Sequence, residues 1–263
     1  MRLKLTIAYD GRPFGGWQSQ PGGNTVQDHL QAALAAIAKQ PLACHGSGRT
    51  DAGVHALGQV AHFDPPPACR MTPANWLAAL NAHLPATIRV LACAAAPADF
   101  HARFSATGKT YHYELCTAPV LPPLQAGLAW HLIRPPDPNL LADALCCFEG
   151  RHDFHAFCAY RGNETPDTDY RRTVTRAACA PLPGGFRLEF AADGFLYKMV
   201  RMLAGAAVRV AQGRMGNDDL RTLLDQPPGL PRGKCHHCAP ACGLYLREVR
   251  YGNGPPPAKP LAG

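Results

Sequence analysis

One carboxylate stands out in the segment from His45 to Phe63, which reads HGSGRTDAGVHALGQVAHF. Asp51 follows Arg49 by two residues, lies between Gly48 and Gly53, and precedes residues that alternate like a β-strand. A nearby guanidinium favours the charged form of a carboxylate, so this aspartate is a candidate nucleophile. The glycines allow a sharp turn and the close approach of a ligand. The alternative is that Asp51 only caps a turn, as aspartate often does.

The same segment does not fit several other kinds of site. GSGRTD has Asp51 where a dinucleotide-binding loop has its third glycine, and no Gly-Lys-Ser/Thr follows it. Hydrolysis of a glycoside ordinarily needs two carboxylates, and this motif offers one. Zinc-dependent deamination of a base needs an H-x-E paired with a P-C-x-x-C, and no P-C-x-x-C string occurs in the sequence.

The cysteines raise a separate question. There are 11, scattered through predicted helices and strands, which is typical of small buried hydrophobic residues rather than a disulfide framework. In KCHHCAPAC, Cys235 and Cys238 form half of a zinc motif, beside His236, His237 and Cys242. No second C-x2-C or H-x3-H occurs to complete it. We therefore expect incidental thiols and no metal, and we keep structural zinc as the alternative.

Composition and charge indicate a folded, basic protein. Apolar residues make up 47% of the 263 residues and charged residues 17%, as in ordinary globular chains. The net charge of +7 suits a polyanionic partner, although many unrelated enzymes share it. MRLKLTIAY alternates polar and apolar residues and so lacks the apolar core of a signal peptide, and no apolar run is long enough to span a membrane. We expect a cytoplasmic protein without a membrane segment.

The pattern along the chain predicts one unit repeated twice. Residues 2–9 alternate like a half-buried strand, and Thr25 is a plausible N-cap for a helix in TVQDHLQAALAAIAK. Two strands, the helix TPANWLAALNAHL and a strand in TIRVLACAA complete a β-α-β-β-α-β order. After Phe100 the order repeats, from the strand KTYHYEL to the strand GLYLREVRY.

Two such units predict an α+β fold with two tandem ferredoxin-like, RRM-like halves. Each half would have an antiparallel sheet with helices on one face, which leaves the other faces free to form a central cleft. We place the N-terminal half, which carries the Asp51 turn, at residues 1–104 and the C-terminal half at 105–252. We expect residues 253–263, NGPPPAKPLAG, to form a flexible Gly/Pro tail.

Five blocks of this sequence resemble the tRNA pseudouridine synthase A family, also called the TruA family. They occur in the family's order along nearly the whole chain. The blocks are YDGRPFGGWQSQPGGNTVQDHL, GSGRTDAGVHALGQVAHF, DFHARFSATGKTYHYEL, FLYKMVRMLAG and APACGLYL. The resemblance implies the pseudouridine synthase fold, usually as a homodimer. It also implies an isomerase that converts uridine to pseudouridine at positions 38, 39 and 40 of the tRNA anticodon stem-loop, without cofactor or metal.

The resemblance also implies roles for individual residues. Asp51 would be the nucleophile, attacking either C1′ of the ribose or C6 of the uracil, and the sequence does not choose between them. Tyr111 would stack on the flipped base and could relay a proton; Arg49 would fill the gap that the base leaves. Arg201 would pair with the nucleophile, and Leu244 would line the pocket floor. The plainer alternatives are a core tyrosine, a generic phosphate contact, a surface helix charge and a core leucine.

RNA affinity should depend largely on phosphate contacts from lysine and arginine. The candidates are Arg12, Lys109, Arg161, Arg171 and Arg172. The sequence departs from the family in the Cys- and His-rich loop before APACGLYL and in GKT before Tyr111. The rival functions are a non-catalytic RNA-binding module with RRM-like halves and an RNA chaperone that retains the site. Against the first, YHYEL and FRLEF lack the aromatic RRM signature.

Overall fold

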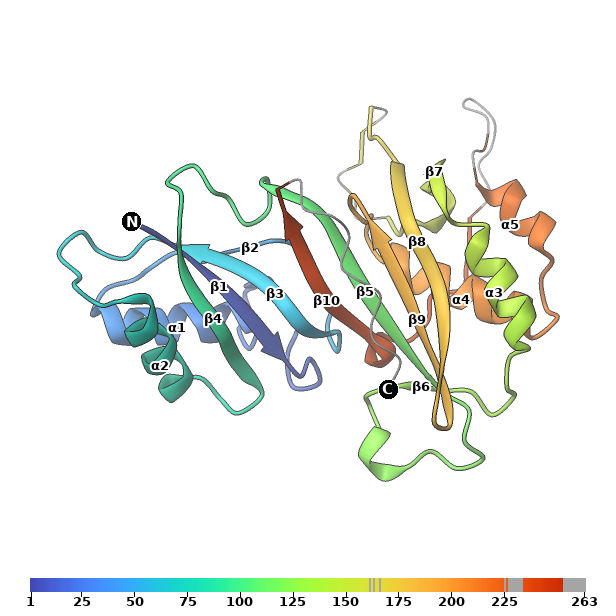
Figure 1. The fold of residues 1–263 in the computed structure, drawn as a ribbon, viewed down its shortest axis with the longest axis horizontal. Helices are drawn as coiled ribbons and strands as arrows, with labels where there is room; N and C mark the ends of the chain where they lie inside the picture. Colours follow the sequence, from blue (N-terminus) through green and yellow to red (C-terminus); the bar gives the residue numbers. More distant parts are fainter. Residues whose placement is uncertain (161, 163, 166, 225, 227–233, 253–263) are drawn as a thin grey trace.

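The structure is a computed structural model in which residues 1–160, 162, 164, 165, 167–224, 226 and 234–252 are described. The described strands form one mixed sheet in the order β4-β1-β3-β10-β5-β9-β8-β7, with β2 paired to β3 and β6 paired to β5 (Figure 1). The strands are β1 (Arg2–Tyr9), β2 (His45–Gly46), β3 (His55–Phe63), β4 (Ile88–Ala96), β5 (Ala106–Cys116), β6 (Trp130–His131), β7 (Gly150–Asp153), β8 (Arg171–Leu182), β9 (Gly185–Ala192) and β10 (Leu244–Tyr251).

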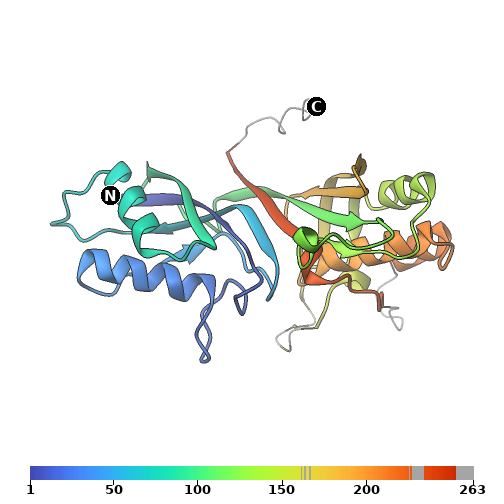
Figure 2. The same cartoon turned by 90° about the horizontal axis from the view of Figure 1, so that it is seen from below.

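The helices lie in two groups at opposite ends of this sheet, and β5 and β10 run between the groups (Figure 2). The first group pairs α1 with α2, and in the second α3 packs on α4. The helices are α1 (Val26–Ala38), α2 (Pro73–His83), α3 (Pro138–Cys146), α4 (Met199–Ala211) and α5 (Asn217–Leu223), with short 3-10 turns η1 (Pro123–Gln125), η2 (His155–Phe157) and η3 (Ala241–Gly243). Among the described residues, no helix is both long enough and apolar enough to cross a membrane.

The local patterns in the N-terminal part produce the predicted elements. In β1 every second side chain, from Leu3 to Tyr9, is buried, so the strand places one apolar face in the core. Thr25 caps α1: its side chain accepts a hydrogen bond from the backbone N–H of Asp28, and the Asp28 carboxylate accepts one from the backbone N–H of Thr25. The order β1-α1-β2-β3-α2-β4 matches the expected β-α-β-β-α-β order of the first unit.

The last strand joins the two parts of the chain. β10 pairs in parallel with β3, where Tyr245 faces His55, and antiparallel with β5, where Leu246 faces Tyr111. The α+β class predicted from the sequence is confirmed, but one continuous sheet takes the place of the two separate sheets that we expected. The physical reason is that β10 satisfies the free hydrogen-bonding edges of both β3 and β5. The predicted tail at 253–263 lies outside the described residues.

Candidate active site

Asp51 lies in the turn between β2 and β3, and buried neighbours fix this turn. The backbone N–H of Trp17 donates to the carbonyl of Thr50 at 3.0 Å, and the hydroxyl groups of Tyr9 and Thr50 lie 2.8 Å apart. Gly53 has a φ of +77°, a left-handed conformation that favours glycine. The turn therefore has one preferred shape, and that shape leaves the Asp51 side chain 24% exposed.

A second set of buried polar contacts holds the start of the turn. The fully buried Gln59 donates from Nε2 to the carbonyl of Gly48 at 3.0 Å and accepts from the Ser47 hydroxyl at 2.6 Å. Lys109 on β5 donates from Nζ to the carbonyl of Ser47 at 2.9 Å. Because these contacts come from β3 and β5, the position of the Asp51 turn is tied to both parts of the sheet.

Arg201 pairs with Asp51 from the other end of the chain. Its Nη1 donates to Asp51 Oδ2 at 2.8 Å, and its Nε donates to the carbonyl of Ala239 at 2.8 Å. The backbone N–H of Ala239 donates in turn to the carbonyl of Arg201 at 3.0 Å. Arg201 belongs to the first turn of α4, after Lys198, whose backbone has a φ of +58°. The guanidinium is thus oriented from two sides, and its side chain is only 15% exposed.

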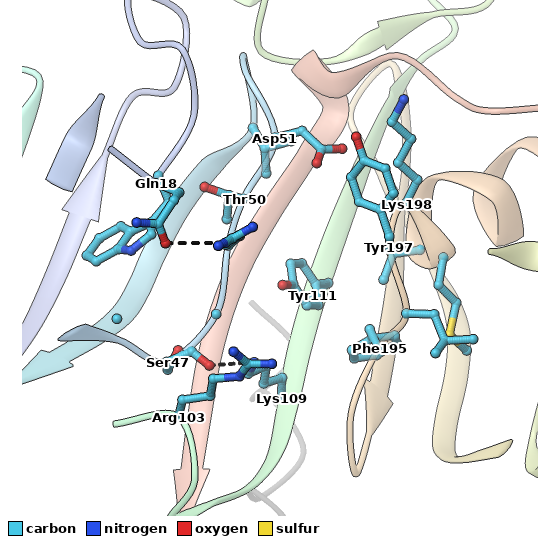
Figure 3. A pocket seen from close by; sticks show the side chains of 18 of the residues that line it. Gln18, Ser47, Thr50, Asp51, Arg103, Lys109, Tyr111, Phe195, Tyr197 and Lys198 are labelled. Atoms are coloured by element: carbon cyan, nitrogen blue, oxygen red, sulfur yellow. Dashed lines mark hydrogen bonds between the residues drawn. The ribbon is translucent and has the colours of Figure 1, made fainter. Parts of the chain in front are cut away.

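Tyr111 on β5 and Leu244 on β10 lie on neighbouring strands and line the same space as Asp51. Tyr111 is 9% exposed, and its ring meets the ring of Phe195 edge to face, with 5.2 Å between the centroids. Burial, with smaller contributions from Tyr9 and Asp51, raises the pKa of Tyr111, so its phenol stays protonated at neutral pH. Leu244 begins β10 and is buried beside the same space. Figure 3 places Tyr111 between Asp51 and Lys109.

These side chains line a cavity of about 670 Å³, which we call the Asp51 cavity. Its wall combines the Asp51 turn, the end of the segment before β5, the strand β5 and the start of α4 (Figure 3). Among the described residues that line it, Asp51 is the single carboxylate. The cations of the wall are Arg49, Arg103, Lys109, Lys198 and Arg201. Such a lining attracts an anionic ligand and brings it to the one carboxylate of the wall.

The structure brings the sequence-predicted site residues together. Asp51, Arg201, Tyr111, Arg49 and Leu244 all line the Asp51 cavity. Arg49 is exposed, and its Nε donates to Gln18 Oε1 at 3.2 Å (Figure 3).

The candidate phosphate contacts are more scattered. Lys109 lines the Asp51 cavity, whereas Arg12 pairs with Asp10 at 2.6 Å outside it. Arg171 and Arg172 lie on β8, also outside the cavity lining. Arg161 falls outside the described residues.

The Cys- and His-rich loop lies against α4. A Cβ atom on Gly205 would sit 2.0 Å from the carbonyl oxygen of His237, so only glycine allows the loop to approach this closely. Within the part of the chain that the structure describes, no three or more His, Cys, Asp or Glu side chains are arranged to hold a metal ion. The loop instead holds Arg201 through two hydrogen bonds with the backbone of Ala239.

Sequence reasoning missed three residues of this site. Phe195 and Lys198 line the Asp51 cavity and belong to the block FLYKMVRMLAG, where only Arg201 received a role. Gln59 is a fully buried polar residue in the middle of β3, between Gly58 and Val60, and this position is the signal that could have identified it.

Comparison with known proteins places this geometry in a family. A family model described as tRNA pseudouridine synthase matches residues 5–105 and 144–252. A protein of Akkermansia muciniphila named tRNA pseudouridine synthase A is 49% identical over 253 residues, which cover 95% of each chain. Proteins of the same name from Methylacidiphilum infernorum and Bacillus subtilis are 42% and 38% identical, and the matches cover 94% and 96% of this chain and 94% and 100% of theirs.

A solved Cbf5-Nop10-Gar1 complex also aligns, at 12% identity over 78% of this chain and 54% of the other, but its TM-score of 0.30 carries no argument. The family match spans both parts of the sheet and includes four of the five blocks on which the sequence resemblance depends, together with the start of the third block, up to Ser105. The chain therefore belongs to the tRNA pseudouridine synthase A (TruA) family, and the family predicted from the sequence is confirmed.

Proposed function

We propose that this protein isomerises uridine to pseudouridine in the anticodon stem-loop of tRNA, at positions 38, 39 and 40, with Asp51 as the nucleophile. One observation carries the proposal for the residue: Asp51 is the single carboxylate in the described lining of a cationic cavity, and it is paired at 2.8 Å with Arg201. The activity is that of the family, whose relatives at 38 to 49% identity bear the name tRNA pseudouridine synthase A.

The reaction needs few catalytic groups because it rearranges the bonds of a single nucleotide. The bond between N1 and C1′ breaks, the uracil turns, and a bond between C5 and C1′ forms. The proton on C5 is removed and N1 gains a proton, so product and substrate have the same composition. Asp51 bonds transiently to C1′ or to C6, and both routes remain open. No oxidant, water or external energy source enters this balance, so the proposal includes no cofactor and no metal.

The other residues of the Asp51 cavity suit a flipped base. A uridine in a stem must leave the helical stack at a cost of a few kcal/mol. The ring of Tyr111 offers a stacking surface, and its protonated hydroxyl can donate a hydrogen bond to the base. Leu244 would form the apolar floor. Arg49, exposed and tied only to Gln18 within the described residues, would enter the gap that the base leaves.

We further propose that the chain consists of two ferredoxin-like halves, residues 1–104 and 105–252, and forms a homodimer. The element order of the first part and the family resemblance support the halves, and the proposed boundary falls in the segment between β4 and β5. The resemblance alone supports the dimer. Light scattering coupled to size-exclusion chromatography measures the mass directly, and a monomer at micromolar concentration would contradict this part of the proposal.

The catalytic proposal is tested with tRNA labelled with tritium at C5 of uridine. Wild-type protein should release tritium and form pseudouridine at positions 38 to 40, as mapped on the product. Asp51→Ala should release none. Asp218→Asn, which removes a fully solvated carboxylate on α5 outside the Asp51 cavity, should react like wild type. Wild-type protein that binds tRNA without forming pseudouridine would favour the RNA-binding or chaperone alternatives, and an active Asp51→Ala would contradict the nucleophile assignment.

A further inference from the structure

The Asp51 cavity extends well past the residues that the reaction uses. Asp51 lies near one end and Tyr111 in the middle, while Ser47, Arg103 and Lys109 lie at the other end (Figure 3). His45, His101 and Phe104 line this far end as well. The proposed chemistry gives none of these residues a role, so the far end is free to serve a second part of the RNA.

A cluster of aromatic rings lies at the far end, and we call it the His101 ring cluster. The rings of His45, His101 and the buried His62 contact one another, with His62 and His101 edge to face at 65°. Phe104 contacts His101. The ring centroids of His62 and His101 are 4.7 Å apart, and those of His101 and Phe104 are 4.4 Å apart at an interplanar angle of 33°. The last ring is the open one, since Phe104 is 77% exposed.

The backbone around Phe104 is held in place rather than loose. Nδ1 of His101 accepts hydrogen bonds from the backbone N–H groups of Arg103 and Phe104, at 3.1 and 3.3 Å. The backbone N–H of Ala102 donates to Nδ1 of the buried His62 at 3.1 Å. Exposure of Phe104 is thus built into the turn, and its ring is presented at low entropic cost. The exposed ring therefore has a defined position beside the cations of the Asp51 cavity.

Two cations without a carboxylate partner lie beside the His101 ring cluster. Within the described residues, neither Arg103 nor Lys109 forms an ion pair with an acidic side chain. The Arg103 guanidinium lies 5.6 Å from the centre of the Phe104 ring. Burial of Lys109, together with the charge of Arg103, lowers the pKa of the Lys109 ammonium to about 8. Two neighbouring cations that repel each other are stabilised by an anion, and a phosphate is the anion that RNA supplies.

We propose that Phe104 is the stacking surface for a second unpaired base of the RNA, adjacent to the target uridine, and that Arg103 and Lys109 hold the phosphate between the two nucleotides. This inference rests on the proposed function, because it assumes that an RNA strand enters the Asp51 cavity. Unstacked bases of RNA loops bind by stacking on aromatic rings, and every base offers such a face. A base on Phe104 would add one more ring to the His101 ring cluster.

The central experiment measures tRNA affinity and pseudouridine formation for Phe104→Ala, Phe104→Trp and Leu124→Ala. Leu124 is 90% exposed and does not line the Asp51 cavity, so it is the matched control for loss of an exposed apolar side chain. Alanine at 104 should weaken tRNA binding about 5- to 100-fold, the usual range for loss of one stacked base. Tryptophan at 104 should retain wild-type affinity because it keeps the ring. The control should also bind like wild type.

A thermodynamic cycle then identifies the base. Anticodon stem-loops that carry one abasic nucleotide, placed in turn on either side of the target, are compared with the intact RNA. For one of these RNAs, loss of the base should weaken binding to wild type. Phe104→Ala should bind that same RNA with the affinity that wild type has for it. The same nucleotide, replaced by fluorescent 2-aminopurine, should be quenched by wild type and not by Phe104→Ala. If the affinity lost through Phe104→Ala and the affinity lost through removal of a base add together at every position, the proposal is wrong.

The outcomes separate this inference from the proposed function. If wild type forms pseudouridine and Phe104→Ala binds tRNA as tightly as Leu124→Ala, the second subsite is wrong and the catalytic proposal stands. If wild type forms no pseudouridine, the proposed function fails first. A change in molecular mass of Phe104→Ala with unchanged RNA affinity would assign Phe104 to a contact between protein chains and would also overturn the proposal.

Discussion

Arg201 Nη1 lies 2.8 Å from Asp51 Oδ2, although the two residues are 150 positions apart in the sequence. The same guanidinium donates from Nε to the carbonyl of Ala239, so two acceptors on different segments define its plane. A fork of this kind is a property of arginine, because a lysine ammonium is a single charged point on a flexible stem. The pair therefore depends on the shape of the guanidinium as well as on its charge.

Replacing Arg201 tests this dependence. Arg201→Lys keeps the charge but cannot reach both acceptors in one orientation, so we expect single-turnover pseudouridine formation to slow by about 10²-fold, in the range for loss of one electrostatic contact at a reacting centre. Arg201→Ala should slow it further. Thermal unfolding checks that both variants fold. Arg187→Lys, at the more exposed pair with Glu114, is the control. Wild-type rates in both Arg201 variants would remove Arg201 from the reaction.

Tyr111 is predicted to act through its ring and its hydroxyl separately. The raised pKa of Tyr111 keeps the phenol protonated, so the hydroxyl can donate a proton or hydrogen bond but does not act as an anionic base at neutral pH. We expect Tyr111→Phe to bind tRNA normally and to react about 10²-fold more slowly. Tyr111→Leu should lose affinity as well. If Tyr111→Phe reacts at the wild-type rate, the proton relay is wrong and stacking remains.

Arg49 has two alternative roles, which are to contact a phosphate or to fill the gap that the flipped base leaves. Arg49→Lys keeps a cation that can contact phosphate but loses the planar group that stacks on bases. We expect Arg49→Lys to retain the salt dependence of tRNA binding while pseudouridine formation slows. Arg49→Gln should reduce the slope of log affinity against log salt by about one contact, roughly 0.7 to 0.9. A normal reaction rate in Arg49→Lys would leave Arg49 as a phosphate contact only.

Local patterns in the sequence predicted the parts of this fold that depend on neighbouring residues. The alternation of residues 2–9 and the capping of a helix by Thr25 are short-range features, and both occur in the structure as expected. The Asp51 turn was also visible, because glycines beside an aspartate restrict what the segment can do.

Contacts between distant segments were beyond the sequence pattern. The parallel pairing of β10 with β3 joins residues nearly 200 positions apart, and nothing in the alternation of either strand specifies its partner. Arg201 was carried to Asp51 by family resemblance, whereas a helix pattern alone would leave it as a surface charge. The hydrogen bond from Arg201 goes to Ala239, in the Cys- and His-rich loop for which structural zinc was the alternative. The loop makes this contact through its backbone carbonyl.

The buried Gln59 is predicted to couple stability to activity. Gln59→Leu removes the acceptor of the Ser47 hydroxyl and of the backbone N–H of Val60, and it removes the donor to the Gly48 carbonyl. We expect the free energy of unfolding to fall by about 1–3 kcal/mol per unsatisfied group, measured by urea denaturation. The Asp51 turn should loosen, and kcat should fall more than tRNA affinity. Gln20→Leu, in an exposed loop, is the control. A fall in stability with unchanged kcat would mean that the turn keeps its shape without Gln59.

The buried His62 is predicted to make the fold sensitive to acid. Burial, with smaller contributions from His101, Arg2 and His45 and against the opposing charge of Asp64, lowers the pKa of His62 to about 4. Between pH 6.5 and about 4 the unfolded chain therefore binds a proton that the folded chain does not, so the free energy of unfolding should fall as the pH falls through this window. The full loss of stability across this window is roughly 3 kcal/mol.

His62→Asn tests this prediction, because it keeps an acceptor for the backbone N–H of Ala102 and cannot titrate. Urea denaturation of this variant should show a pH dependence that is shallower by one proton. His236→Asn, at an exposed position, is the matched control, and equal slopes in all three proteins would assign the acid sensitivity to other groups.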